Sequence, residues 1–188
     1  MERSEPQRPG GIAPTAVFGT VGAIVLVDAF TKFLAVDRLV PVHMPHQVFG
    51  EWLRLTLVYN RGAAFGFHLG PYSRWLFIGL TAVALVVLWN LYRTSAATAR
   101  LRVVALASIA GGAIGNVIDR VRWNRGVVDF LDLGVGEWRW PTFNVADIAV
   151  SVGAITLAAV LWREDAAAAR AASQGAIAPS ADGAPTAS

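Results

Sequence analysis

Long apolar runs alternate with polar segments along the chain and define its predicted elements. Four runs are long enough to cross a bilayer: residues 16–36, 75–92, 101–118 and 145–162. A helix rises 1.5 Å per residue, so each run spans roughly 27 to 31 Å, about the thickness of one hydrocarbon core. The pattern predicts a mainly α-helical membrane protein, with four transmembrane helices in a single membrane-embedded domain over 15–165.

Between the first two runs the periodicity changes. The stretch WLRLTLVYN (52–60) alternates apolar and polar residues, as a half-exposed strand does. It is followed by NRGAAFG (60–66), where Gly62 and Gly66 leave the backbone with little side-chain cover. Such a stretch suits either a tight turn or the close approach of an extended peptide.

The two ends of the chain differ from these runs. Residues 1–14 are polar and contain prolines and a glycine pair, which indicates a flexible tail. Residues 166–188 are rich in Ala, Ser, Gly and Pro, and we expect them to be disordered, with residual helix at most near the start. The first apolar run is about 20 residues long, contains Asp28 and Lys32, and lacks a small-x-small cleavage site, so we expect it to be retained as a helix.

Composition narrows the function classes. The 188 residues are 55% hydrophobic and 15% charged, with a mean hydropathy of +0.49, which is too apolar for an ordinary soluble domain. The absence of cysteine excludes disulfides and thiol nucleophiles, and the three histidines form no HExxH-like pair, so we expect no metal or other cofactor. The net charge of +3 comes from arginines spread through the loops, which does not favour a nucleic-acid surface.

Arginine density suggests the orientation in the membrane. An even number of spans places both termini on one side, and Arg93, Arg100 and Arg102 crowd the short turn on that side. Basic residues concentrate in cytoplasmic loops, so we expect both termini in the cytoplasm.

Two charges interrupt the first apolar run. Asp28 and Lys32 are spaced i, i+4 and share one helix face. Each would be unfavourable alone in hydrocarbon, so we expect a structural ion pair, either turned toward the other helices or snorkelling to the interface.

The third run carries a polar stripe. Gly111 and Gly115 form a GxxxG pattern, which allows a neighbouring helix to come close. Asn116 then shares a face with Asp119 or Arg120 toward the end of the run. A simpler interpretation is that Asp119 and Arg120 mark where the helix leaves the membrane.

Two carboxylates flank the start of the fourth run. Asp129 lies in VVDFLDL (127–133), which suits a short interfacial helix or strand, and Asp147 follows Asn144 at the start of the run. Two close carboxylates in a poorly hydrated site share a proton and can activate water. The alternative is that Asp129 is solvated on a loop and Asp147 caps or pairs at a helix start.

The motifs NRGAAFG, GNVIDR, VVDF and FNVAD, in this order among four spans, resemble the lipoprotein signal peptidase family, signal peptidase II. The resemblance covers residues 25–162 and implies an aspartyl catalytic dyad of Asp129 and Asp147. Gly62 is a further candidate because of its bare backbone. The remaining positions that the resemblance assigns to support of the dyad or of bound substrate are Asn60, Gly115, Asn116, Asp119, Arg120, Asn144 and Ala146.

The resemblance also implies an environment and a substrate. The β-rich cradle of the family would occupy residues 42–67, on the outer face of the bacterial cytoplasmic membrane. The substrate would be a prolipoprotein with a diacylglyceryl cysteine, cut just before that cysteine. We expect a monomer surrounded by membrane lipids, without nucleic acid.

Two rival functions make different demands. A small proton-coupled transporter would use Asp28, Lys32, Asp119 and Asp147 as a relay, and it requires acids spread along the membrane depth. A membrane scaffold without catalysis leaves the polar residues of GNVIDR and FNVAD without a role.

Overall fold

Four long helices make up most of the molecule. The computed structural model describes residues 14–62, 72–96 and 99–177. The helices are α1 (Pro14–Arg38), α2 (Ser73–Thr94), α3 (Arg100–Arg122) and α4 (Val145–Ile177), and each is long and apolar enough to cross a membrane. They confirm four membrane-capable helices at the predicted places; the first three extend a few residues beyond the predicted runs, and α4 extends much further.

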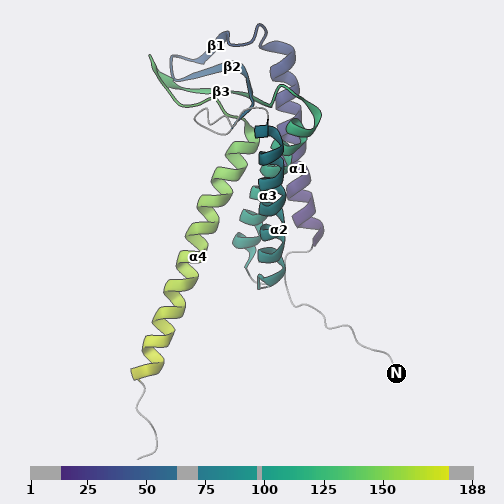
Figure 1. Cartoon of the computed structure of the whole chain (residues 1–188). Coiled ribbons are helices and arrows are strands. Elements are labelled where there is room, and N and C mark those ends of the chain that lie inside the picture. Colours follow the sequence, from purple (N-terminus) through teal and green to yellow (C-terminus); the bar gives the residue numbers. More distant parts are fainter. Residues whose placement is uncertain (1–13, 63–71, 97–98, 178–188) are drawn as a thin grey trace, which may run out of the picture.

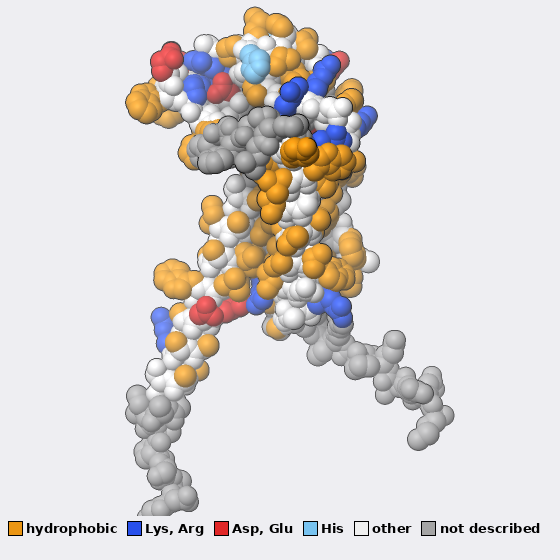
Figure 2. Space-filling view, in the orientation of Figure 1, with side chains coloured by type: hydrophobic (Ala, Val, Ile, Leu, Met, Phe, Trp, Pro, Cys, Tyr) orange, Lys and Arg blue, Asp and Glu red, His pale blue; other side chains and the backbone are white. Residues whose placement is uncertain are grey.

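The outward surfaces of these helices are apolar. α2 buries only Ser73, while Leu80, Val83 and Val86 are each more than half exposed. Figure 2 shows hydrophobic side chains along the helical part of the molecule, with charged side chains gathered at its two ends. This distribution suits a multi-pass membrane protein, because hydrocarbon solvates the apolar side chains while the helices satisfy their own backbone groups.

A small antiparallel sheet lies across one end of the helices (Figure 1). Its strands, in spatial order, are β1 (Pro45–Phe49), β2 (Leu53–Asn60), β3 (Val127–Val135) and β4 (Trp138–Arg139). Of the two conformations open to residues 127–133, the strand is the one observed. The predicted β-rich segment 42–67 contains β1 and β2, and its part from 63 onward lies outside the described residues.

Apolar residues from α1 and the sheet bury one another. Leu57 of β2 and Val128 and Phe130 of β3 pack against Ala35 and Leu39 at the end of α1. This small core fixes the sheet on the end of the helical bundle.

α3 is the central helix because its glycines bring two neighbours close. A Cβ added at Gly111 would lie 3.0 Å from the Cβ of Ile24 in α1, so this part of the GxxxG pattern faces α1. A Cβ added at Gly112 would lie 2.8 Å from Val150 in α4. The two glycines therefore define the faces of α3 on which α1 and α4 pack.

α4 is longer than the sequence analysis predicted. It continues to Ile177, so the helix that we allowed near the start of the tail is present and runs through residues 166–177. This stretch contains AAAARAA, and alanine has the most favourable intrinsic helix propensity. In Figure 1 this end of α4 extends beyond the other three helices. The expected N-terminal tail, 1–14, lies outside the described residues except for Pro14.

Candidate active site

Asp129 is held on a strand and not on a solvated loop. It lies opposite Val58 in the β2–β3 ladder, next to a bulge where two residues of β2 face one residue of β3. Its exposed fraction is 2%. Asn60 Nδ2 donates to Asp129 Oδ2 at 3.0 Å, and Asn144 Nδ2 donates to Oδ1 at 2.7 Å.

Asp147 forms a reciprocal cap with Asn144 at the start of α4. The Asp147 backbone N–H donates to Asn144 Oδ1 at 2.9 Å, and the Asn144 backbone N–H donates to Asp147 Oδ2 at 3.2 Å. This is the capping-box geometry, with Asn144 at the N-cap and the acid three residues later. The expected capping role of Asp147 is therefore present, and it fixes the direction of the carboxylate.

The loop before α4 is tied to β3, which brings the two acids together. Phe143 N donates to Leu131 O at 3.0 Å, and Phe143 O accepts from the backbone N–H groups of Phe130 and Leu131. Asn144 follows directly and is fully buried. Its side chain consequently bonds to Asp129 on one side and caps α4 on the other.

Asn116 of α3 is the second amide link. Asn116 Nδ2 donates to Asp147 Oδ1 at 2.8 Å, and Asn116 Oδ1 accepts from Asn144 Nδ2 at 3.1 Å and from Lys32 Nζ at 3.0 Å. The prediction that Asn116 points into the bundle is confirmed. Asn116 thus joins the site acids to a charged cluster in the helices.

That cluster is built around Lys32. The ammonium lies 2.7 Å from Asp28 Oδ2 and 2.8 Å from Asp119 Oδ2, and its exposed fraction is 4%. With Asn116 as third acceptor, all three Lys32 donors have partners. Of the two arrangements expected for the Asp28–Lys32 pair, the one turned toward the bundle is present, and the pair gains Asp119.

The Asp28 and Asp119 carboxylates also accept hydrogen bonds from backbone N–H groups of neighbouring elements. Asp28 Oδ1 accepts from the Ala146 N–H at 2.9 Å, and Asp119 Oδ2 accepts from the Val128 N–H at 3.2 Å. A Cβ added at Gly115 would lie 2.6 Å from Asp28 Oδ2, so only glycine allows this approach. Asp119 therefore positions β3 and does not point at the dyad, and Gly115 and Ala146 serve close packing.

Asn60 and Arg120 organise the segment after β2. Asn60 Oδ1 accepts from the Gly62 N–H at 3.0 Å, while Arg120 donates to the carbonyls of Gly62 and Asn116, each at 3.3 Å. The guanidinium also lies over the ring of Phe77, 5.2 Å from its centroid. Arg120, which the resemblance assigns to support of the dyad or of bound substrate, therefore binds backbone carbonyls. The rest of NRGAAFG, with Ala63, Ala64 and Gly66, lies outside the described residues.

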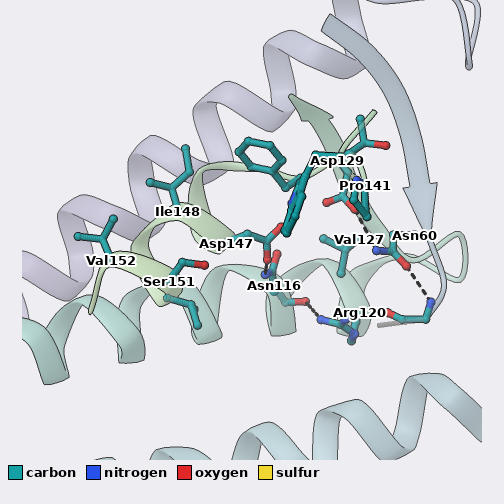
Figure 3. Close-up of a pocket in the computed structure, with 15 residues that line it drawn as sticks. Asn60, Asn116, Arg120, Val127, Asp129, Pro141, Asp147, Ile148, Ser151 and Val152 are labelled. Carbon is teal, nitrogen blue, oxygen red and sulfur yellow. Dashed lines mark hydrogen bonds between the residues drawn. The ribbon is translucent and has the colours of Figure 1, made fainter. Parts of the chain in front are cut away.

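Asp129 and Asp147 line the same cavity of about 420 Å³ (Figure 3). In the figure, Asn60 lies beside Asp129 and Asn116 beside Asp147. Much of the cavity wall was not predicted from the sequence: it comes from the segment just before α4 and from the first turns of that helix. These residues are Trp140, Pro141, Thr142, Phe143, Ile148, Val150, Ser151 and Val152. The i, i+4 spacing of Asp147 and Ser151, which places both on one face of α4, was the available signal.

The electrostatics of the cavity favour one proton on the two acids. Burial, reinforced by the negative charge of Asp147, raises the pKa of Asp129 to about 7, and this outweighs the opposing hydrogen bonds from Asn60 and Asn144. Within the described residues neither acid forms an ion pair, and no group of three metal-ligand side chains converges. One acid can therefore hold a proton while the other is ionised, which is the requirement for paired general acid and base.

Comparison with known proteins gives a consistent answer. Residues 20–163 match the family described as signal peptidase (SPase) II. The chain is 41% identical over 152 residues to the lipoprotein signal peptidase of Paraburkholderia phymatum, covering 80% of this chain and 89% of that protein. It is 43% identical over 150 residues to the lipoprotein signal peptidase of Burkholderia thailandensis, covering 79% and 87%.

A solved structure agrees with these sequence matches. A bacterial membrane enzyme determined by the in meso method at 2.3 Å resolution superimposes with a TM-score of 0.74 and 26% identity, covering 83% of this chain and 93% of that one. The fold, the position of the paired acids and the length of the sequence matches lead to one conclusion. The chain belongs to the signal peptidase II family of aspartic-type membrane peptidases.

Proposed function

We propose that this protein cleaves diacylglyceryl-modified prolipoproteins just before the lipidated cysteine, with Asp129 and Asp147 as the catalytic dyad. The observation that carries the proposal is the shared cavity in which both carboxylates are oriented by neutral amides and, among the described residues, neither forms an ion pair. The matched relatives are named lipoprotein signal peptidases, which supports the substrate class.

The geometry assigns different roles to the two acids. Asp129 is the more buried, and its pKa of about 7 leaves a protonated population near neutral pH that can donate a hydrogen bond to the scissile carbonyl oxygen. Ionised Asp147 removes a proton from water, and the resulting hydroxide attacks the carbonyl carbon. When the C–N bond breaks, the proton held by Asp147 passes to the leaving amine, and the dyad returns to its single shared proton.

Amide groups keep the carboxylates in position during this sequence. Asn60 and Asn144 hold Asp129, and Asn116 and the Asn144 backbone hold Asp147. Such fixed donors lower the reorganisation required as charge moves between the acids. Gly62 lines the cavity, and because its N–H and carbonyl already bond to Asn60 and Arg120, we propose that it shapes the cavity wall rather than pairing with the substrate main chain.

The same proposal sets the position in the membrane. With both termini cytoplasmic, the sheet and the cavity face the outer side of the cytoplasmic membrane, where the lipidated cysteine of a translocated precursor lies. The dyad needs nothing from a second copy of the chain, so we propose a monomer that works in direct contact with membrane lipids and needs no cofactor.

The geometry argues against a transporter. Such a relay would need its acids at successive depths, whereas Asp28, Lys32 and Asp119 form one closed cluster near the sheet and Asp147 lies one amide away from it. A stationary ion-paired cluster offers no stepwise path for protons.

Separate Asp129→Asn and Asp147→Asn proteins test the proposal on a diacylated prolipoprotein peptide. Both should lose at least roughly a thousandfold in turnover, because each acid carries a proton in a different step. Asp132→Asn is the matched control, since Asp132 lies on the same strand and pairs with Arg139 outside the cavity. Turnover within tenfold of wild type by either dyad variant would eliminate the dyad.

A further inference from the structure

A second cavity, of about 220 Å³, lies between α1, α3 and the sheet. It shares no lining residue with the cavity that holds Asp129 and Asp147. The contacts of the catalytic site therefore do not account for it.

Two arginines form the polar edge of this second cavity. Arg122 ends α3, and Arg125 lies in the connection to β3; both are exposed. Each guanidinium lies over an aromatic ring, Arg122 at 4.9 Å from the Trp123 centroid and Arg125 at 5.6 Å from that of Tyr59. Among the described residues neither arginine forms a salt bridge, so their donors are available to a ligand.

The nearest fixed charges do not cancel these arginines. Lys32 and Asp119 line the inner end of the cavity, but they are bonded to each other, and Lys32 is also bonded to Asp28. This cluster carries one formal negative charge, whereas Arg122 and Arg125 carry two positive charges. The cavity as a whole therefore favours an anion at its arginine edge.

The remaining wall is apolar and faces the bilayer. Phe33 and Val36 of α1 and Ile118 of α3 line it, with exposed fractions of 65%, 40% and 41%. All three belong to membrane-spanning helices. A ligand that fits both parts has an anionic head beside arginines and aromatic rings, and a hydrocarbon chain that descends along the helices.

We propose that this cavity binds one anionic glycerophospholipid from the surrounding leaflet. Its phosphodiester would accept hydrogen bonds from Arg122 and Arg125, because the planar guanidinium matches phosphate oxygens and tolerates stacking on an aromatic face. One acyl chain would lie against Phe33 and Ile118. A bound lipid here would bridge α1, α3 and the connection to β3, whose backbone position Asp119 already fixes.

Native mass spectrometry of the full chain in detergent tests this with phosphatidylglycerol and phosphatidylcholine as probes. Wild type should retain phosphatidylglycerol preferentially, and Arg122→Gln/Arg125→Gln should retain it at least roughly tenfold less, since each arginine near an anionic headgroup contributes separately. Arg93→Gln is the control, because Arg93 lies in the last turn of α2 at the opposite end of the bundle.

Three results would overturn the proposal. They are unchanged lipid retention in the double variant, an equal loss in Arg93→Gln, and equal retention of the two lipids by wild type. Soluble glycerol 3-phosphate separates the sources of the phosphate. If glycerol 3-phosphate displaces the lipid at equal concentration, the site recognises a free phosphate ester without an acyl contact at Phe33, and the lipid proposal fails. Phe33→Ala, which keeps both arginines, should weaken lipid retention without changing the folded yield.

Discussion

Two neighbouring pairs of acids at the sheet end of the helices are held in opposite ways. Asp28 and Asp119 share the ammonium of Lys32, whereas Asp129 and Asp147 accept hydrogen bonds from neutral amides. The first pair shares one ammonium, and both of its acids also accept hydrogen bonds from backbone N–H groups. The second is oriented but retains its capacity to exchange a proton.

Asn116 joins the two pairs of acids in one hydrogen-bond network. Its oxygen accepts from Lys32 and its amide nitrogen donates to Asp147. The Asn116 amide therefore lies between the Lys32 ammonium and the Asp147 carboxylate. We infer that a protein can place acids of the same type within one network and give them different chemistry by the charge of the donor alone.

The largest effect should come from removing the cation. Lys32→Met leaves Asp28 and Asp119 buried without their partner, and we expect a loss of about 3 to 5 kcal/mol in unfolding free energy. Chemical unfolding in detergent micelles measures it. Arg38→Met, which breaks an exposed pair at the end of the same helix, should cost no more than about 1 kcal/mol. Equal losses in the two variants would show that burial does not distinguish the pairs.

Removing an acid from the amide-bound pair should instead increase the unfolding free energy at high pH. Because the pKa of Asp129 rises from 3.8 to about 7 on folding, its contribution to stability is complete below pH 3.8 and is lost as pH rises to about 7. The loss is roughly 1.4 kcal/mol for each pH unit in that window. Asp129→Asn should not show this decline and should be the more stable protein at pH 8. If the unfolding free energies of wild type and Asp129→Asn change in parallel with pH, the raised pKa of Asp129 is contradicted.

The same protonation should limit catalysis. Above about pH 7 Asp129 loses the proton used to polarise the carbonyl, so kcat/KM should fall roughly tenfold per pH unit. This pH dependence is measured as steady-state kcat/KM between pH 6 and 9, with a substrate peptide that has no side chain titrating in that range. Asp132→Asn should give the same profile as wild type. A flat profile from pH 7 to 9 would reassign the proton to another group.

The smallest effect should come from the link between the pairs. Asn116→Ala removes three side-chain hydrogen bonds, one to Asp147, one from Lys32 and one from Asn144, while both carboxylate clusters keep their other contacts. We expect kcat to fall roughly tenfold with KM nearly unchanged, because orientation of the base is lost and substrate contacts are kept. Asn116→Gln should restore little, since the longer side chain misplaces both groups. A larger change in KM than in kcat would place Asn116 in substrate binding.

Much of this arrangement could be predicted from local patterns. Apolar runs determine the four helices, and i, i+4 spacing predicts the Asp28–Lys32 pair. The candidates Asn116 and Asn144 stand out because amides beside acids are unusual within such runs. These features depend on residues near one another in the sequence, where periodicity carries the information.

Other features depend on contacts between distant segments. Nothing near Asp119 indicates that it bonds to Lys32 and to the backbone of Val128, and nothing near Arg120 indicates its two carbonyl partners. The bulge beside Asp129 arises from the pairing of β2 with β3, strands separated by two membrane helices. The length of the helix in the tail was underestimated because its low complexity concealed a high helix propensity.

The cap at the start of α4 affects how the protein adapts to bilayers of different thickness. Asn144 caps the helix and holds Asp147, and it directly follows Phe143, which pairs with β3. The sheet therefore determines the depth of the Asp147 carboxylate in the membrane. The surplus length of α4 all lies toward its other end. A thinner or thicker bilayer can therefore be matched there by tilt or by exposure of the alanine-rich turns, while the reacting groups keep their level at the opposite surface.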